Sequence, residues 1–135
     1  MLTVEARYLG DLRVECEHVQ SGTKLVTDAP TDHHGRGQSF SPTDLCCTSL
    51  GTCVMTIMGI WAAEKNIDLK GTRIEITKTM AADPRRIKRI DLVYHFPPNN
   101  FSAEDKAAIE RIARTAPVPL SLSPDIEQVF VFDWN

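Results

Sequence analysis

Residues 41–65 read SPTDLCCTSLGTCVMTIMGIWAAEK, and this stretch decides the fold. It opens with a helix start signal, in which Ser41 can cap free N–H groups, Pro42 suits the first helical position and Asp44 stands where a capping-box acid belongs. The helix that follows is apolar on almost every side, so it must be buried. Because it also carries three of the four cysteines, Cys53 is the first residue to consider for chemistry.

Size and composition limit the class of protein. The chain has 135 residues, 42% of them hydrophobic and 24% charged, which is ordinary for one soluble globular domain. A net charge of -3 argues against a nucleic-acid binder, and the basic run at 85–89 is typical of a solvated hairpin end. The longest apolar run, Cys53 to Ala63, is too short to span a bilayer, so no membrane is expected.

The N-terminal residues and the cysteines both bear on the cellular compartment of the protein. Met1 to Glu5 lacks the basic-then-apolar pattern of a signal peptide, so we expect a cytoplasmic protein. Thiols stay reduced there unless they do redox work. The four cysteines therefore indicate free thiols, a metal site or redox chemistry rather than a disulfide scaffold.

Hydrophobic periodicity predicts an α+β domain over residues 1–135 with the order βββ-α-ββ-α-β. The expected elements are strands at 3–9, 12–18 and 23–27, a polar loop at 28–39, a helix at 42–65, hairpin strands at 72–78 and 90–96, a helix at 102–116 and a strand at 129–132. The long helix offers more apolar surface than one small sheet can cover, so a second subunit is expected to bury the remainder.

The pattern also makes predictions for single residues. Ser102 is expected to cap the helix at 102–116, with Asp105 at the capping-box position. The inward face of the strand at 90–96 is expected to consist of Ile90, Leu92, Tyr94 and Phe96. Alternation places Leu12, Val14, Cys16 and His18 on one face of a strand, with His18 as a core histidine. The strand at 129–132 is apolar on both faces, so it is either central in a sheet or covered by a partner.

The cysteines of the long helix cannot form a zinc site by spacing, because no C-x-x-C pair or partner histidine stands nearby. Cys46 and Cys47 lie about 10 and 9 Å of helix rise from Cys53, whereas a disulfide needs about 4.4–6.8 Å between Cα atoms. Cys46 and Cys47 are therefore expected as small core residues. Around Cys53 the side chains are unusually small, as at Gly51 and Gly59, and both a functional and a core role stay open.

The adjacent residues His33 and His34 invite a metal interpretation. They stand in a polar loop beside Asp32, without a cysteine or third histidine nearby in sequence. Neighbouring loop residues usually point in different directions, so a solvated loop is expected and no metal or other cofactor is predicted.

Several motifs together resemble the OsmC/Ohr family of osmotically inducible and organic-hydroperoxide-resistance proteins. They are Ser41-Pro42-x-Asp44-Leu45, Leu50-Gly51-x-Cys53, Glu64-Lys65, Leu69-Lys70-Gly71 and the ending Pro117-Val118-x-Leu120-Ser121-Leu122-Ser123-Pro124. Element order and length agree as well, so the resemblance covers nearly the whole chain. It implies an intertwined homodimer with active sites at the subunit interface.

The resemblance also implies roles for particular residues. Cys53 takes the position of the thiolate that attacks the peroxide O–O bond and becomes a sulfenic acid. The family's second thiol, which condenses with it as a disulfide, falls at Ala116, so the resolving cysteine is absent. Turnover would then need an external thiol reductant, or Cys16 as an alternative resolver.

Two further family features are altered in this chain. A glutamate ten residues before the reactive thiol is replaced by Thr43, and the adjacent Asp44 is either its substitute or only the helix cap. An N-terminal arginine that stabilises the thiolate has no clear counterpart, and Arg13 and Arg36 are the candidates. A thiolate in an apolar core needs such a cation.

The sequence thus predicts a thiol-dependent peroxidase that reduces organic or other hydroperoxides through Cys53, with Asp44, Arg36 and Arg13 as candidate helpers. The alternative is a non-catalytic protein of the same fold that binds a small apolar ligand at the dimer interface. A third interpretation makes Cys53 a structural thiol and places function in the loop at 28–39.

Overall fold

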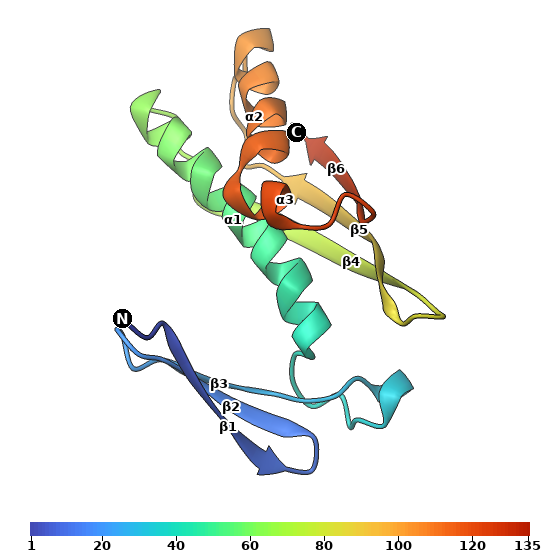
Figure 1. The fold of residues 1–135 in the computed structure, drawn as a ribbon. Coiled ribbons are helices and arrows are strands. Elements are labelled where there is room, and N and C mark those ends of the chain that lie inside the picture. The colour runs from blue at the N-terminus through green and yellow to red at the C-terminus, as the bar shows by residue number, and fades with distance from the viewer. The chain divides into compact units, whose positions relative to one another are not determined.

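The computed structural model describes residues 1–135, which divide into two compact units, Met1–Cys46 and Cys47–Asn135. Figure 1 follows the elements in chain order. The boundary falls inside the long helix α1, Pro42–Glu64, whose bounds agree with the predicted helix. Two helices longer than two turns and two three-stranded sheets confirm the α+β class, whereas the single-domain expectation stays a prediction.

The first unit is an antiparallel sheet of β1 (Val4–Gly10), β2 (Arg13–His18) and β3 (Lys24–Thr27), followed by a short 3-10 helix, η1 (Thr31–His33). Asp11 and Leu12 form the tight turn between β1 and β2, with φ of 53° and 64°. The prediction that Leu12 lies on a strand face is therefore wrong, because a two-residue hairpin turn of this kind takes positive φ at both positions.

The prediction of a core histidine at His18 is also wrong. His18 ends β2, is exposed, and its Nδ1 lies 2.6 Å from the hydroxyl of Ser21. His18 pairs with the exposed residue Val4 at the end of the sheet, so nothing buries its ring there. Asp28 differs from the prediction in the opposite direction, because it belongs to the predicted polar loop at 28–39 but is only 1% exposed. Its carboxylate accepts hydrogen bonds from the N–H groups of Ala29 and Gln38, so it organises the loop from within.

The second unit contains the sheet β4 (Arg73–Ala81), β5 (Arg86–His95) and β6 (Glu127–Asp133), in that order. β4 and β5 form an antiparallel hairpin, whereas β6 pairs parallel with β5. β6 is thus an edge strand, and the option that it is central in a sheet is wrong. Its connection through a helix returns it parallel to β5, and no further strand of the chain pairs with its other edge.

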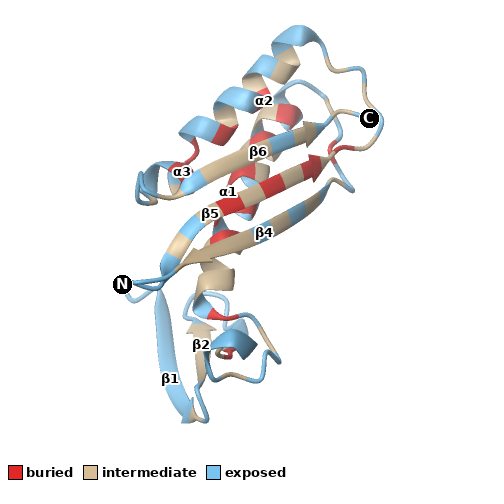
Figure 2. Ribbon diagram, turned by 90° about the vertical axis from the view of Figure 1, so that its right-hand side faces the viewer, coloured by how far each residue is buried: buried red, intermediate tan, exposed pale blue.

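The helices α1, α2 (Ala103–Thr115) and α3 (Pro117–Ser121) supply the rest of the second unit's core. The predicted cap of α2 is confirmed, because Ser102 and Asp105 exchange side chain-to-backbone hydrogen bonds. α3 was not expected, and Pro117 starts it immediately after α2 ends. Figure 2 shows the buried residues alternating along β5 and gathered on the side of α2 toward the sheet. The residues predicted to face inward are buried: Ile90, Leu92 and Tyr94 of β5 are 0% exposed, and Phe96, directly after β5, is 2% exposed.

α1 buries only one stripe of its surface, formed by Cys47, Leu50, Gly51, Val54, Met58 and Ala62. On another side Ile60 is 56% exposed. The helix as a whole is long and apolar enough to cross a membrane by length and composition. The sequence prediction considered only the shorter apolar run from Cys53 to Ala63, and the expected absence of a membrane stays a prediction. The core helix of a soluble protein passes the same criterion, and the stripe that α1 buries against the sheet is of that kind.

Candidate functional site

Cys53 lies on α1 within the second unit, beside the hydrophobic core. Its neighbours in the helix, Leu50 and Val54, are 0% exposed, whereas Cys53 itself is half-buried and packs against the core cluster. This position combines apolar walls with partial access. A thiol that is both held in place and reachable is the kind that can react, whereas a fully buried thiol is inert.

The polar group that meets the sulfur comes from α3. The backbone N–H of Val118 donates a hydrogen bond to Sγ of Cys53, with an N···S distance of 3.5 Å. Val118 is the second residue of α3, and N–H groups in the first turn of a helix have no partner within that helix. The N–H is therefore free to support electron density on the sulfur.

Ala116 stands two residues before this contact and is 2% exposed. It ends α2, and its backbone N–H donates to the carbonyl of Ile112. The position at which the resemblance places a resolving thiol thus belongs to the segment that touches Cys53, but it carries a methyl group. None of the four cysteines forms a disulfide.

Tyr94 is a further member of this site that the sequence pattern placed only in the core. It is 0% exposed, and its hydroxyl donates a 2.8 Å hydrogen bond to the carbonyl of Gly51, two residues before Cys53. Burial, and after it the charge of Cys53, raise the pKa of Tyr94 above its usual value. The phenol therefore stays a hydrogen-bond donor that fixes this turn of α1. Alternation along β5 could place the ring inward but could not show which backbone group it meets.

The other cysteines of α1 differ from Cys53 in burial. Cys47 is 2% exposed, as expected for a core residue, whereas Cys46 is half-buried. In a continuous helix Cys46 and Cys53 share a face but are separated by about 10 Å of rise. The structure therefore keeps the separation that excludes a disulfide between them.

Asp44 forms the predicted cap at the start of α1. Its carboxylate accepts from the backbone N–H of Ser41, and the hydroxyl of Ser41 accepts from the N–H of Asp44. Asp44 precedes Cys53 by nine residues, which is about 13.5 Å of rise and half a rotation around the helix. Within one chain, helix geometry therefore keeps its carboxylate away from the thiol.

The two candidate arginines belong to the first unit. Arg13 begins β2, and its guanidinium donates to the side-chain carbonyl of Gln38 at 2.8 Å. Arg36 is exposed in the loop that follows η1. Thr43, at the position of the family's glutamate, lies with its hydroxyl 3.2 Å from that of Ser41.

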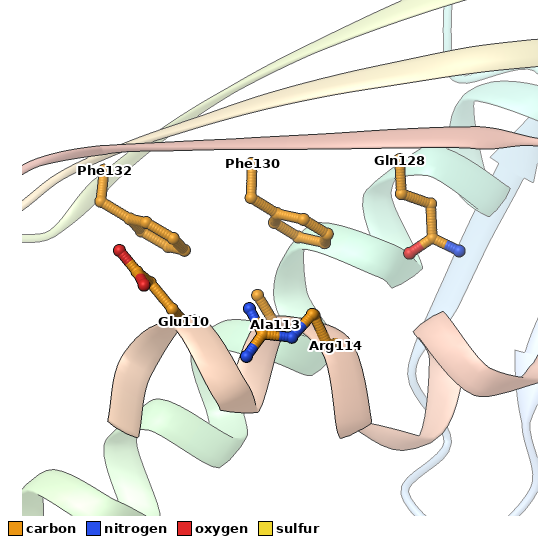
Figure 3. Close-up of a pocket in the computed structure, with 6 residues that line it drawn as sticks. All are labelled: Glu110, Ala113, Arg114, Gln128, Phe130 and Phe132. Carbon is orange, nitrogen blue, oxygen red and sulfur yellow. The ribbon is translucent and has the colours of Figure 1, made fainter. Parts of the chain in front are cut away.

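A separate cleft of about 310 Å³ lies in the second unit between α2 and β6. Phe130, Phe132 and Gln128 extend from β6 toward Glu110, Ala113 and Arg114 of α2, as Figure 3 shows. The amide of Gln128 also donates to the carbonyl of Pro119. The cleft offers two aromatic rings with one acidic and one basic side chain, which suits a small, partly apolar molecule.

The side chains that could bind a metal ion are histidine, cysteine, aspartate and glutamate. No group of three or more histidine, cysteine, aspartate or glutamate residues is placed to hold a metal ion. His33 and His34 are exposed, with ring centroids 5.3 Å apart. Of the reactive groups in the structure, a half-buried thiol with a backbone donor is the one best suited to nucleophilic chemistry.

Comparison with known proteins places this geometry in context. The model of the OsmC family, described as OsmC-like protein, matches residues 35–128. A search of curated proteins found no match. Among solved structures, a candidate osmotic stress induced and detoxification response protein from Psychrobacter arcticus 273-4 is 42% identical, with a TM-score of 0.94 and coverage of 98% of this chain and 96% of that one.

Two more distant structures share the fold. An organic hydroperoxide resistance protein OsmC from Legionella pneumophila is 17% identical with a TM-score of 0.74, covering 98% of this chain and 97% of that one. An organic hydroperoxide resistance protein from Elizabethkingia anophelis is 14% identical with a TM-score of 0.76, covering 100% and 98%. The family match over residues 35–128 and the 42% identical structure lead to one conclusion: the chain belongs to the OsmC-like protein family.

Proposed function

We propose that this protein is a thiol-dependent peroxidase that reduces organic or other hydroperoxides, with Cys53 as the nucleophile. The observation that carries the proposal is the environment of the Cys53 sulfur on α1. This sulfur is half-buried and accepts a hydrogen bond from the backbone N–H of Val118 on α3. Structures described as hydroperoxide resistance proteins share the fold, which supports a role in peroxide stress.

The reaction uses this chain's own thiol in a balanced sequence. The Cys53 thiolate attacks one oxygen of the peroxide, the O–O bond breaks, and the other oxygen leaves as an alcohol after it takes a proton. Cys53 is then a sulfenic acid. An external thiol attacks the sulfenic sulfur and releases water, and a second thiol reduces the mixed disulfide and restores Cys53. Because residue 116 is alanine, the external thiol takes the place of a resolving cysteine.

The proposal includes a cation near the sulfur, since a thiolate beside an apolar core needs one. Arg13 and Arg36 stay the candidates, and Asp44 stays a candidate to orient the arginine.

The proposal also includes a homodimer, in which a second copy covers the exposed side of α1 and contributes to the site. A reducing compartment such as the cytoplasm would keep the four thiols free.

Trapping the sulfenic acid tests the function directly. The reduced protein is treated with an alkyl hydroperoxide in the presence of dimedone, and the modified residue is located by mass spectrometry. The proposal predicts a label on Cys53, no such label in Cys53→Ser, and an unchanged label in Cys16→Ser. Labelling confined to another cysteine, or a Cys53 that stays reduced, would contradict the proposal.

A second candidate function is the binding of a small apolar ligand without catalysis. The cleft lined by Phe130 and Phe132, between α2 and β6, favours it. The two functions differ in their response to peroxide. A ligand binder would show chemical-shift changes at these rings on titration with an aromatic carboxylate such as benzoate, while Cys53 would oxidise no faster than free cysteine.

A further inference from the structure

The candidate nucleophile Cys53 has no second thiol at disulfide distance on its own helix. Ala116 occupies the family's resolving position, and Cys46 and Cys47 are held about 10 and 9 Å away along the same helix. A sulfenic acid at Cys53 would therefore stay exposed to further oxidation unless another group reacts with it.

The group that meets the sulfur is a backbone amide. The N–H of Val118 lies 3.5 Å from Sγ of Cys53, although the two residues are 65 positions apart in the chain. Val118 N–H has no acceptor within α3 because it belongs to the first helical turn. Its loss would therefore break no backbone hydrogen bond of a helix or strand.

We propose that oxidised Cys53 condenses with the backbone nitrogen of Val118 to form a sulfenyl amide, a reversible covalent bond between α1 and α3. This inference rests on the proposed function, because hydroperoxide is the oxidant that produces the sulfenic acid. Condensation of a sulfenic acid with a backbone nitrogen is known chemistry for cysteine. Here the amide nitrogen replaces the missing thiol at residue 116.

The step balances without a further oxidant. The sulfenic S–O bond breaks and an S–N bond forms, while the hydroxyl group leaves with the amide proton as water. The sulfur keeps its oxidation state. An external thiol later attacks the sulfur, the S–N bond breaks, and the amide nitrogen recovers its proton. The mixed disulfide that results is reduced by a second thiol. The sulfenyl amide thus protects Cys53 from irreversible oxidation until a thiol reaches it.

The tryptic peptides of this chain make the bond easy to recognise. Cleavage after Arg36 and Lys65 gives a peptide of residues 37–65, which contains Cys53. Cleavage after Arg114 gives residues 115–135, which contain Val118 and no cysteine. A covalent link between the two peptides therefore cannot be a disulfide.

The experiment treats the full-length reduced protein with tert-butyl hydroperoxide in the absence of thiols, followed by thiol blocking, digestion and tandem mass spectrometry. The expected product joins peptide 37–65 to peptide 115–135 at Cys53 and Val118, with the loss of two hydrogen atoms. Dithiothreitol should separate the peptides. A Cys53 that accumulates as a dimedone-reactive sulfenic acid without the linked peptide overturns this inference and leaves the peroxidase intact. Absence of any oxidation at Cys53 contradicts both.

A matched pair of variants tests the nitrogen itself. Proline has no N–H to lose and is tolerated in the first turn of a helix, so Val118→Pro should abolish the linked peptide. Val118→Ala keeps the N–H and should retain it. Circular dichroism of both variants verifies the fold. Equal amounts of linked peptide in both would show that the bond does not involve the Val118 nitrogen.

Discussion

Single residues around Cys53 separate this protein from the pattern of its family, and Ala116 is the one whose replacement is most informative. Ala116 is buried in the segment whose Val118 N–H reaches the sulfur. We expect Ala116→Cys to form a disulfide with Cys53, so that each equivalent of hydroperoxide removes two free thiols. The matched control is Ala113→Cys, one turn earlier in α2, where the side chain faces the cleft at Phe130 instead. Equal thiol loss in both variants would show that residue 116 has no special relation to Cys53.

Tyr94 provides a second prediction at the scale of one residue. Tyr94→Phe removes the buried hydrogen bond to Gly51 and keeps the ring, so the free energy of unfolding should fall by about 1 kcal/mol. Denaturant unfolding measures the change. Tyr8→Phe, at a tyrosine that is 63% exposed, serves as the control and should change stability by less than about 0.5 kcal/mol. If Tyr94→Phe leaves the free energy of unfolding unchanged, this hydrogen bond does not support the turn of α1 before Cys53.

Between strands, a charged cluster on the outer face of the second sheet predicts a pH dependence of stability. His95 of β5 contacts Glu75 of β4 and Asp133 of β6, and Arg73 lies beside Glu75. Hydrogen bonds that His95 donates to Asp133 and then to Glu75 raise the pKa of His95, and the same bonds lower the pKa of each carboxyl. The stabilisation of the folded state by His95 is complete below the unfolded pKa of 6.5 and is lost as the pH rises through the folded pKa. The carboxylate contributions are complete above the unfolded values of 4.5 and 3.8 and are lost toward acid.

The cluster should therefore stabilise the sheet most between pH 4.5 and 6.5. We expect His95→Gln to lower the midpoint of thermal unfolding near pH 6.5 and to have less effect at about pH 9, because the contribution of the histidine is lost as the pH rises through its raised folded pKa. His18→Gln is the matched control, because His18 is exposed and has no carboxylate partner. A His95→Gln effect of equal size at both pH values would contradict the account.

The same elements show which parts of the fold can be predicted from sequence. Capping signals and periodicity act locally, so they correctly predicted α1, the cap at Ser102 and the buried face of β5. The edge position of β6 depends on strand pairing across long distances in the chain, which the pattern does not contain. α3 has only five residues, too few for a periodic pattern, so in the sequence Pro117 indicates only the end of the preceding helix.

Within the candidate site, the sequence proposes Cys53 as the nucleophile but does not reveal the groups that surround it. Cys53 could be selected because small and apolar neighbours follow a strong cap. The donor that reaches its sulfur is a backbone N–H of Val118, and any residue other than proline supplies such a group. Tyr94 was recognised as a core side chain, but its bond to Gly51 depends on how α1 lies on the sheet. Asp28 was missed because a polar loop pattern does not reveal which carboxylate turns inward.

At the scale of the whole molecule, α1 has an apolar face that the core of the second unit does not bury. Ile60 of α1 is 56% exposed, and a methyl group added at Gly59 would meet nothing within 4 Å. If a second copy covers this face, the protein should sediment as a dimer, and Ile60→Lys should weaken the dimer by at least about tenfold because it buries a charge. Ile60→Val keeps the apolar surface and should leave association nearly unchanged. A wild-type protein that stays monomeric at all accessible concentrations would contradict the proposed assembly.

If Cys53 is a peroxidatic nucleophile, hydroperoxide should oxidise it faster than an ordinary thiol. Stopped-flow kinetics with an alkyl hydroperoxide give the second-order rate constant for loss of the Cys53 thiol, with free cysteine measured at the same pH. The account predicts that Cys53 reacts at least about tenfold faster than free cysteine, which corresponds to about 1.4 kcal/mol of transition-state stabilisation. A rate constant for Cys53 equal to or below that of free cysteine would contradict it.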